Sequence, residues 1–136
     1  MQVRRVGGAY GAKISRNVQI ICICALVSHK LNLPARLVMT IEDNMRSIGK
    51  RITAYMEYDL GTDSNGLIQY QHATYWGNVG STFNESQTLS TLSHYFNCYD
   101  SSTWNSIGYD ALTDIPSNTW CRAPGLILFN QNSVTL

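Results

Sequence analysis

The sequence lacks an apolar run close to the roughly 20 residues that a membrane-spanning helix needs, and it shows no signal peptide. Its four cysteines lack the spacing of a metal site: Cys22 and Cys24 are two apart on a predicted helix, and Cys98 and Cys121 stand alone. Cysteines without a signal peptide indicate a reducing compartment. We therefore expect a soluble, cytoplasmic segment with no membrane partner, whose cysteines are small buried apolar residues rather than metal ligands.

Acidic residues are scarce in the first part of the chain, and basic residues are scarce in the rest. Residues 1–51 carry nine Lys and Arg against Glu42 and Asp43, a net charge of +7, whereas residues 52–136 carry only Arg122 against seven acids, a net charge of −6. A basic half is typical of proteins that bind phosphate groups or nucleic acid, although attraction between the two halves of one domain explains it equally well. The length of 136 residues fits one modest core rather than two.

Glycines and cations gather in residues 4–13, RRVGGAYGAK, immediately before an apolar stretch. Glycine accepts positive φ angles and lets a ligand approach the backbone, and the free N–H groups at a helix start attract anions. The segment therefore indicates an anion-binding turn built on Gly7, Gly8 and Gly11. We call residues 4–13 the glycine loop.

The spelling of the glycine loop weighs against two familiar nucleotide motifs and leaves two interpretations open. A phosphate-binding P-loop fails at two fixed positions, because Ala12 replaces its second glycine and Ile14 replaces its hydroxyl residue. A dinucleotide fingerprint fails because no G-x-G precedes Gly11. The stretch from Gly8 to Gly11 also matches the GXXG clamp of a KH-type RNA-binding module. An ordinary glycine-rich turn into a helix is the simplest alternative.

Hydrophobic patterning predicts an α+β fold, with a mixed sheet, a β-hairpin and a buried helix. Residues 15–33 are predicted to form a helix, and residues 20–27 within it are apolar on nearly every side, which predicts that a sheet or other domains cover it. Residues 36–41 read as a strand that runs into a turn at 42–45. Asn65-Gly66 predicts a hairpin between strands 52–60 and 67–76. A short helix at 86–96 and a strand at 104–112 precede a loop that begins near Asp114 and carries Arg122 and Gly125.

Several motifs together resemble a known family. They are the glycine loop, PARLVMTIEDNM at 34–45, GKR at 49–51, GNVG at 77–80 and NTWCRAPG at 118–125. In order and approximate spacing they are similar to the molybdenum-cofactor (molybdopterin) domain of the xanthine dehydrogenase and aldehyde oxidase family. The resemblance covers residues 1–125. It implies that these residues are a partial cofactor-binding domain of a larger enzyme, followed by a divergent tail at 126–136.

The resemblance implies an oxidoreductase that hydroxylates carbon with water-derived oxygen at a molybdenum centre held by a pyranopterin dithiolene. In this family electrons pass through 2Fe-2S clusters to FAD, which would bind outside this chain. The backbone N–H groups of Tyr10 and Arg122 would contact the molybdenum cofactor, and Gly7, Gly8 and Gly11 would permit the approach. The expected partners are the remainder of the full-length enzyme, in a homodimer, and no nucleic acid.

Three matched positions imply the substrate class. Ile14 stands where the xanthine-oxidising members place a glutamate, Phe83 where they place an arginine, and Pro124 where they place a phenylalanine. Loss of the acid and the cation removes the groups that would bind a purine, because burying an unpaired purine amide would cost about 1 to 3 kcal/mol. The resemblance therefore implies an aldehyde or apolar heterocycle as substrate, and residues 120–125 look most like those of insect aldehyde oxidases.

The residues that would complete the chemistry are absent from the sequence. The general-base glutamate of the family belongs to a part of the enzyme outside this chain, so we assign no catalytic residue and no metal ligand here. We expect the isolated chain to oxidise no aldehyde. Two alternatives remain: a small GXXG-type RNA-binding module, and a truncated, catalytically dead product that interacts with the full enzyme.

Overall fold

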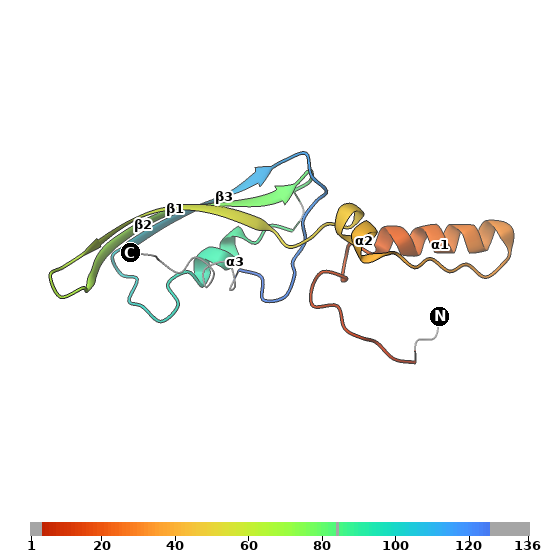
Figure 1. Ribbon diagram of the computed structural model, residues 1–136, viewed down its shortest axis with the longest axis horizontal. Helices are drawn as coiled ribbons and strands as arrows, with labels where there is room; N and C mark the ends of the chain where they lie inside the picture. Colours follow the sequence, from red (N-terminus) through yellow and green to blue (C-terminus); the bar gives the residue numbers. More distant parts are fainter. Residues whose placement is uncertain (1–3, 84, 126–136) are drawn as a thin grey trace.

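The computed structural model describes residues 4–83 and 85–125. In chain order its elements are α1 (Val18–Leu31), α2 (Ile41–Ser47), β1 (Thr53–Thr62), β2 (Ile68–Gly80), α3 (Thr88–Ser93) and β3 (Trp104–Leu112). Figure 1 shows an elongated arrangement, with α3 beside the sheet and with α1 and α2 beyond one end of it. Helices beside a mixed sheet confirm the predicted α+β class.

The sheet has three strands in the order β1-β2-β3. β1 and β2 form the predicted antiparallel hairpin, and the Asp63 carboxylate secures its turn by accepting the N–H groups of Asn65 at 2.8 Å and Leu67 at 2.9 Å. β3 runs parallel to β2, which requires the crossover that contains α3. Thr88 and Leu92 of this helix lie directly over Gly108 of β3, where a side chain would collide with them. α3 is shorter than the predicted helix at 86–96.

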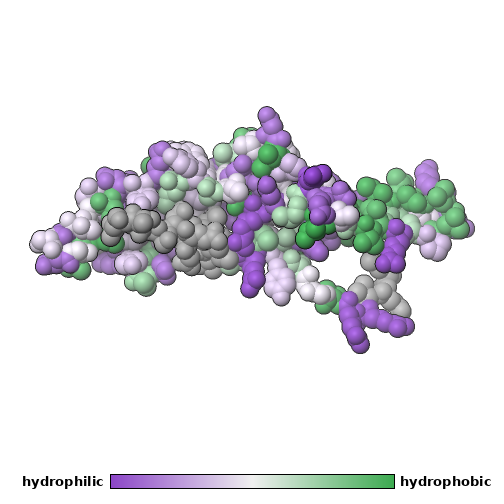
Figure 2. Space-filling model, viewed as in Figure 1, coloured by the Kyte–Doolittle hydropathy of each residue, from purple (hydrophilic) through white to green (hydrophobic). Residues whose placement is uncertain are grey.

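α1 forms where a helix was predicted, and local chemistry explains where it ends. His29 and Lys30 lie in its last turn, where cations interact favourably with the free carbonyl groups, and Asn32 closes it in the left-handed region with φ of 50°. The sequence predicted a buried helix, but among the described residues no side chain of α1 is buried. Figure 2 shows hydrophobic residues gathered over the end of the molecule that α1 forms in Figure 1.

Two expectations from the sequence are wrong. Residues 36–41 form no strand, and the turn expected at 42–45 belongs to α2, because the Thr40 hydroxyl caps the helix by accepting the Asp43 N–H at 3.1 Å. The cysteines are not buried either. Cys22 and Cys98 are exposed and the other two are half-buried.

The most deeply buried side chains come from the sheet and its approach, from Thr91 of α3 and from the loop at 114–125, which we call the Arg122 loop. Ile52, Tyr75 and Val79 are each 1% exposed, and Asn118 and Thr119 are buried with them. Backbone bonds from Asn118 N–H to the Val79 carbonyl at 2.9 Å and from Thr119 N–H to the Lys50 carbonyl at 3.0 Å attach the loop to this core. The core thus fixes the loop that carries a predicted site residue.

Among the described residues, no helix is long and apolar enough to cross a membrane.

Candidate functional site

The structure brings the glycine loop and the Arg122 loop into direct contact, although they are more than a hundred residues apart in sequence. The Arg122 N–H donates to the Tyr10 carbonyl at 2.7 Å. The guanidinium carbon of Arg122 lies 5.8 Å from the centroid of the Tyr10 ring, within the range of a cation–π interaction. Both side chains remain exposed. Two predicted site residues therefore meet at one point on the surface.

Unusual backbone conformations hold this contact. Tyr10 has φ of 48° and Arg122 has φ of 39°, which is the left-handed region that side-chain-bearing residues adopt at a cost of about 1 to 3 kcal/mol. Gly11 is also left-handed, with φ of 84°, and a Cβ there would lie 2.5 Å from the Trp120 carbonyl oxygen. Glycine is therefore required at position 11 for the two loops to touch. A Cβ at Gly7 would meet nothing within 4 Å.

The backbone N–H groups of Tyr10 and Arg122, both expected to face a ligand, differ in whether a backbone acceptor already binds them. The Arg122 N–H is already taken by the Tyr10 carbonyl. Within the described residues, the Tyr10 N–H has no backbone acceptor. The Arg51 guanidinium donates to the Arg122 carbonyl at 2.8 Å, which adds a cation to the site. The positive charge predicted for the first part of the chain thus reaches the contact between the loops.

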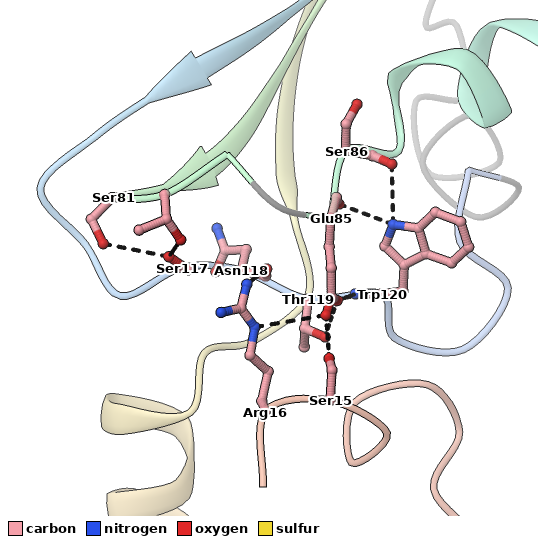
Figure 3. A network of polar contacts seen from close by, with 10 residues as sticks. Ser15, Arg16, Ser81, Glu85, Ser86, Ser117, Asn118, Thr119 and Trp120 are labelled. Carbon is pink, nitrogen blue, oxygen red and sulfur yellow. Dashed lines mark hydrogen bonds and ion pairs between the residues drawn. The ribbon is translucent and has the colours of Figure 1, made fainter. Parts of the chain in front are cut away.

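Glu85, between β2 and α3, links the segments on both sides of this contact (Figure 3). Its carboxylate accepts the Ser15 hydroxyl, the Thr119 hydroxyl at 2.5 Å and the Trp120 N–H at 3.1 Å. Arg16 lies 3.9 Å from the same carboxylate and donates to the Asn118 carbonyl at 3.1 Å. The sequence did not identify Glu85 as a site residue, since its partners lie 34 or more positions away and leave no local pattern.

The environment of Glu85 favours its charged form. Burial raises the pKa of the carboxyl group, but the bonds from Ser15, Thr119 and the Trp120 N–H, together with the Arg16 charge, outweigh burial and leave the pKa below its ordinary value. The Trp120 indole N–H also donates to the Glu85 carbonyl at 2.9 Å and to the Ser86 carbonyl at 3.1 Å. The carboxylate is therefore a fixed negative charge among donors.

Acidification is expected to weaken this network. Because the folded-state pKa of Glu85 is below its unfolded-state value, its contribution to stability is present above the unfolded-state pKa and is lost as pH falls through the folded-state pKa. We expect the unfolding temperature to fall with pH in this acid range, and to fall less in Glu85→Gln. Thermal melts across the range would measure this. The control Glu57→Gln, at an exposed position on β1, should retain the full acid response. An unchanged response in Glu85→Gln would contradict the expectation.

A cavity of about 320 Å³ adjoins the contact and is lined by Gly11, Ile14, Ser15, Glu85, Ser86 and Trp120. Ile14 is 72% exposed and, with the Trp120 indole, gives the cavity an apolar wall. Of the three predicted substrate residues, only Ile14 lines this cavity. Phe83 is 66% exposed just after β2, and the Pro124 carbonyl lies 3.5 Å from the Ser90 hydroxyl of α3. Ile14 therefore shares the cavity with one predicted cofactor residue, Gly11, whereas Phe83 and Pro124 do not line it.

Ser90 is a neighbour of the site that the sequence did not suggest. Besides the hydroxyl contact with Pro124, a Cβ at Gly125 would lie 2.9 Å from the Ser90 hydroxyl oxygen, so α3 packs closely on the end of the Arg122 loop. Among the described residues, no group of three or more His, Cys, Asp or Glu side chains is placed to hold a metal ion.

Known proteins resemble this chain across almost all of its length. Residues 1–129 match the family described as the molybdopterin cofactor-binding domain. A probable aldehyde oxidase of Caenorhabditis elegans is 29% identical over 92% of the chain, a nicotinate hydroxylase of Emericella nidulans 31% over 91%, and a xanthine dehydrogenase/oxidase of Felis catus 28% over 92%. The matched segment is 9% to 10% of the length of these relatives. The domain boundary predicted after residue 125 stays a prediction.

The loop contact, its glycine and its cations lie within this match, and the relatives include aldehyde-oxidising and xanthine-oxidising enzymes at similar identity. The chain belongs to the molybdopterin cofactor-binding domain family of the xanthine dehydrogenases and aldehyde oxidases.

Proposed function

We propose that this chain supplies part of the cofactor and substrate site of a molybdenum hydroxylase of the aldehyde oxidase type, which oxidises aldehydes to carboxylic acids with oxygen from water. The observation that carries the proposal is the apolar wall formed by Ile14 and Trp120 beside the contact of the two loops. The relatives alone do not distinguish this activity from xanthine oxidation, because both kinds of enzyme match at 28% to 29% identity.

The residues present fit molybdopterin by the chemistry of their donors. The Tyr10 N–H has no backbone acceptor among the described residues, so this donor is available to a ligand. The exposed guanidinium groups of Arg4, Arg5 and Arg122 suit the anionic groups of the cofactor. Bound molybdopterin would supply the metal centre at which the substrate carbon is oxidised. In the proposal, Tyr10, Arg122 and the three loop glycines hold and orient it.

The side chains at the cavity would select the substrate. An apolar aldehyde loses little when it leaves water for a wall of Ile14 and Trp120, whereas a purine would leave its polar edge without partners there. Phe83 and Pro124 are proposed to complete the apolar surroundings in the full enzyme. The general base, the 2Fe-2S clusters and FAD are proposed to come from the remainder of the enzyme, acting as a homodimer in the cytoplasm.

The proposal can be tested in an extract of the source. An antibody raised against residues 100–122 would be applied to a native gel that is also stained for substrate-dependent dye reduction. We expect the antibody to mark a species several times heavier than 15.2 kDa that stains with an aldehyde and not with xanthine. A marked species that stains only with xanthine would refute the aldehyde oxidase assignment. A marked species near 15.2 kDa with no activity would favour the catalytically dead product instead.

Ile14→Glu is expected to reverse the substrate preference of the active species that carries this sequence. A carboxylate in the apolar wall must be desolvated whenever an apolar aldehyde binds, so kcat/KM for benzaldehyde should fall by about tenfold or more. Binding of a purine, which can pair with the new carboxylate, should improve.

Steady-state kinetics with benzaldehyde and xanthine would measure both changes. Val6→Glu is the control, because Val6 is also apolar and exposed, lies in the neighbouring glycine loop and does not line the cavity. Equal losses in the two variants would show that Ile14 does not face the substrate.

A further inference from the structure

We propose that Glu85 is a positioning residue, whose carboxylate fixes the glycine loop against the Arg122 loop in the arrangement that receives the cofactor. The inference rests on the proposed function, since it assigns the two loops to cofactor binding. Glu85 belongs to neither loop. Its backbone lies between β2 and α3, in a segment that is itself tied to the Arg122 loop by the Ser81 N–H, which donates to the Ile115 carbonyl at 3.0 Å.

Each oxygen of the Glu85 carboxylate serves one side of the contact (Figure 3). Oε1 accepts the Ser15 hydroxyl and faces Arg16 Nε at 3.9 Å, and these residues lie two and three positions after the glycine loop. Oε2 accepts the Thr119 hydroxyl at 2.5 Å and the Trp120 N–H at 3.1 Å, and these residues lie three and two positions before Arg122. A single carboxylate thus connects chain segments 70 and 35 positions away from it.

The same geometry argues against a direct chemical role for Glu85. An ionised carboxylate offers about four acceptor positions. Here three donors occupy acceptor positions, namely the Ser15 hydroxyl, the Thr119 hydroxyl and the Trp120 N–H, and the Arg16 guanidinium adds an ion pair at 3.9 Å. A group so occupied has little capacity to accept a proton from a substrate or to bind a polar substrate atom. Its value to the site lies in holding its donors in place.

The hydrogen bonds to the Glu85 carboxylate, which we call the clamp, lie beside the contact between Tyr10 and Arg122. Thr119 and Trp120 lie just before Arg122, and the Trp120 carbonyl is the atom nearest to a Cβ at Gly11. A shift of the Trp120 backbone would therefore alter both the packing on Gly11 and the bond from the Arg122 N–H to the Tyr10 carbonyl. The indole bond from Trp120 to the Glu85 carbonyl at 2.9 Å resists such a shift from a second direction.

Hydrogen exchange measured by mass spectrometry on the full chain without cofactor tests the clamp. Glu85→Gln keeps the size of the side chain but removes its charge and replaces one acceptor oxygen by a donor. We expect amide exchange in residues 10–16 and 118–123 to accelerate by about tenfold, while exchange in β1 and β2 is unchanged. Glu57→Gln, the same chemical change at an exposed position on β1, should alter neither loop.

A second variant covers the case in which Glu85→Gln does not fold. Thr119→Val keeps the shape of a buried side chain and removes only the hydroxyl that donates to Glu85. It should also accelerate amide exchange in both loops. Acceleration in residues 10–16 is the informative result, because Thr119 lies in the other loop. For either variant, acceleration in only one of the two loops would overturn the proposal. Acceleration spread equally over the strands, or unchanged exchange in both loops, would overturn it as well.

Cofactor retention separates this inference from the proposed function. The unaltered chain would be incubated with molybdopterin, freed of excess, and assayed for bound pterin by its fluorescence after oxidation. If the unaltered chain retains molybdopterin and Glu85→Gln retains about tenfold less or lower still, Glu85 acts as a positioning residue. Loosened loops in a chain that never retains molybdopterin would refute the proposed function while leaving the clamp established. Loosened loops with unchanged retention would overturn the role of Glu85 toward the cofactor.

Discussion

Gly11→Ala is expected to separate the glycine loop from the Arg122 loop and to reduce molybdopterin retention by about tenfold or more. The added Cβ would lie 2.5 Å from the Trp120 carbonyl oxygen and 3.0 Å from the Trp120 carbonyl carbon, at a residue whose φ is 84°. Both obstacles are backbone atoms that no side-chain rotation relieves. The left-handed conformation alone costs an L-residue about 1 to 3 kcal/mol. The chain can escape the collision only by moving one loop, which breaks the bond from the Arg122 N–H to the Tyr10 carbonyl.

The measurements for this prediction are the free energy of unfolding by chemical denaturation and the amount of bound pterin. Gly7→Ala provides a matched control within the same loop, because a Cβ there meets nothing within 4 Å and the residue has no positive φ. It should leave the free energy of unfolding close to that of the unaltered chain. If Gly11→Ala retains the cofactor as well as the unaltered chain does, the loop contact is not the cofactor site.

The elements that the sequence predicted correctly depend on short-range chemistry. Asn65-Gly66 predicted the hairpin because both residues tolerate positive φ, and the observed turn has Gly66 at 81°. α2 was missed although its signals are also local. Thr40 caps it, Glu42 and Asp43 occupy its first turn and Arg46 its last. Ile41, the first residue of α2, is β-branched, which favours a strand and conflicts with the local signals for a helix start.

The candidate site shows where local patterns stop being informative. Tyr10 and Arg122 were paired through resemblance to a family, since no periodicity or spacing rule connects residues so far apart. Glu85 was missed because each of its donors comes from another part of the chain. Long-range hydrogen bonds leave no trace in composition, and a lone glutamate in a polar stretch looks like any surface acid.

The exposed apolar surface of α1 follows from the same limit. Its composition predicts a covered helix, and six of its larger apolar residues are between 42% and 63% exposed: Val18, Ile21, Ile23, Leu26, Val27 and Leu31. Composition states what environment a helix needs but not which surface provides it. The matched segment is about a tenth of the length of the relatives. The composition of α1 does not identify the surface that packs against it.

Asn118→Asp should destabilise the chain by about 3 kcal/mol at neutral pH, because it places a charge in the core that carries the Arg122 loop. The Asn118 side chain is 1% exposed, and its amide nitrogen donates to the Asn78 carbonyl of β2 at 2.8 Å. A carboxylate cannot donate, so two acceptor oxygens would face each other without water. The loop would detach from the end of the sheet, and Arg122 would move away from Tyr10. We therefore expect loss of molybdopterin retention together with loss of stability.

The pH dependence of this variant distinguishes a buried charge from a simple packing defect. Burial beside a carbonyl oxygen should raise the folded-state pKa of the introduced carboxyl above its unfolded-state value, so the folded form would bind the proton more tightly. The deficit in stability relative to the unaltered chain should then shrink as pH falls through that interval, because a protonated carboxyl can donate to the Asn78 carbonyl. Denaturation at neutral and acid pH would measure it. Asn105→Asp, at an exposed position on β3, should show no deficit at either pH. A deficit in Asn118→Asp that is constant with pH would mean that lost packing, and not the charge, releases the Arg122 loop.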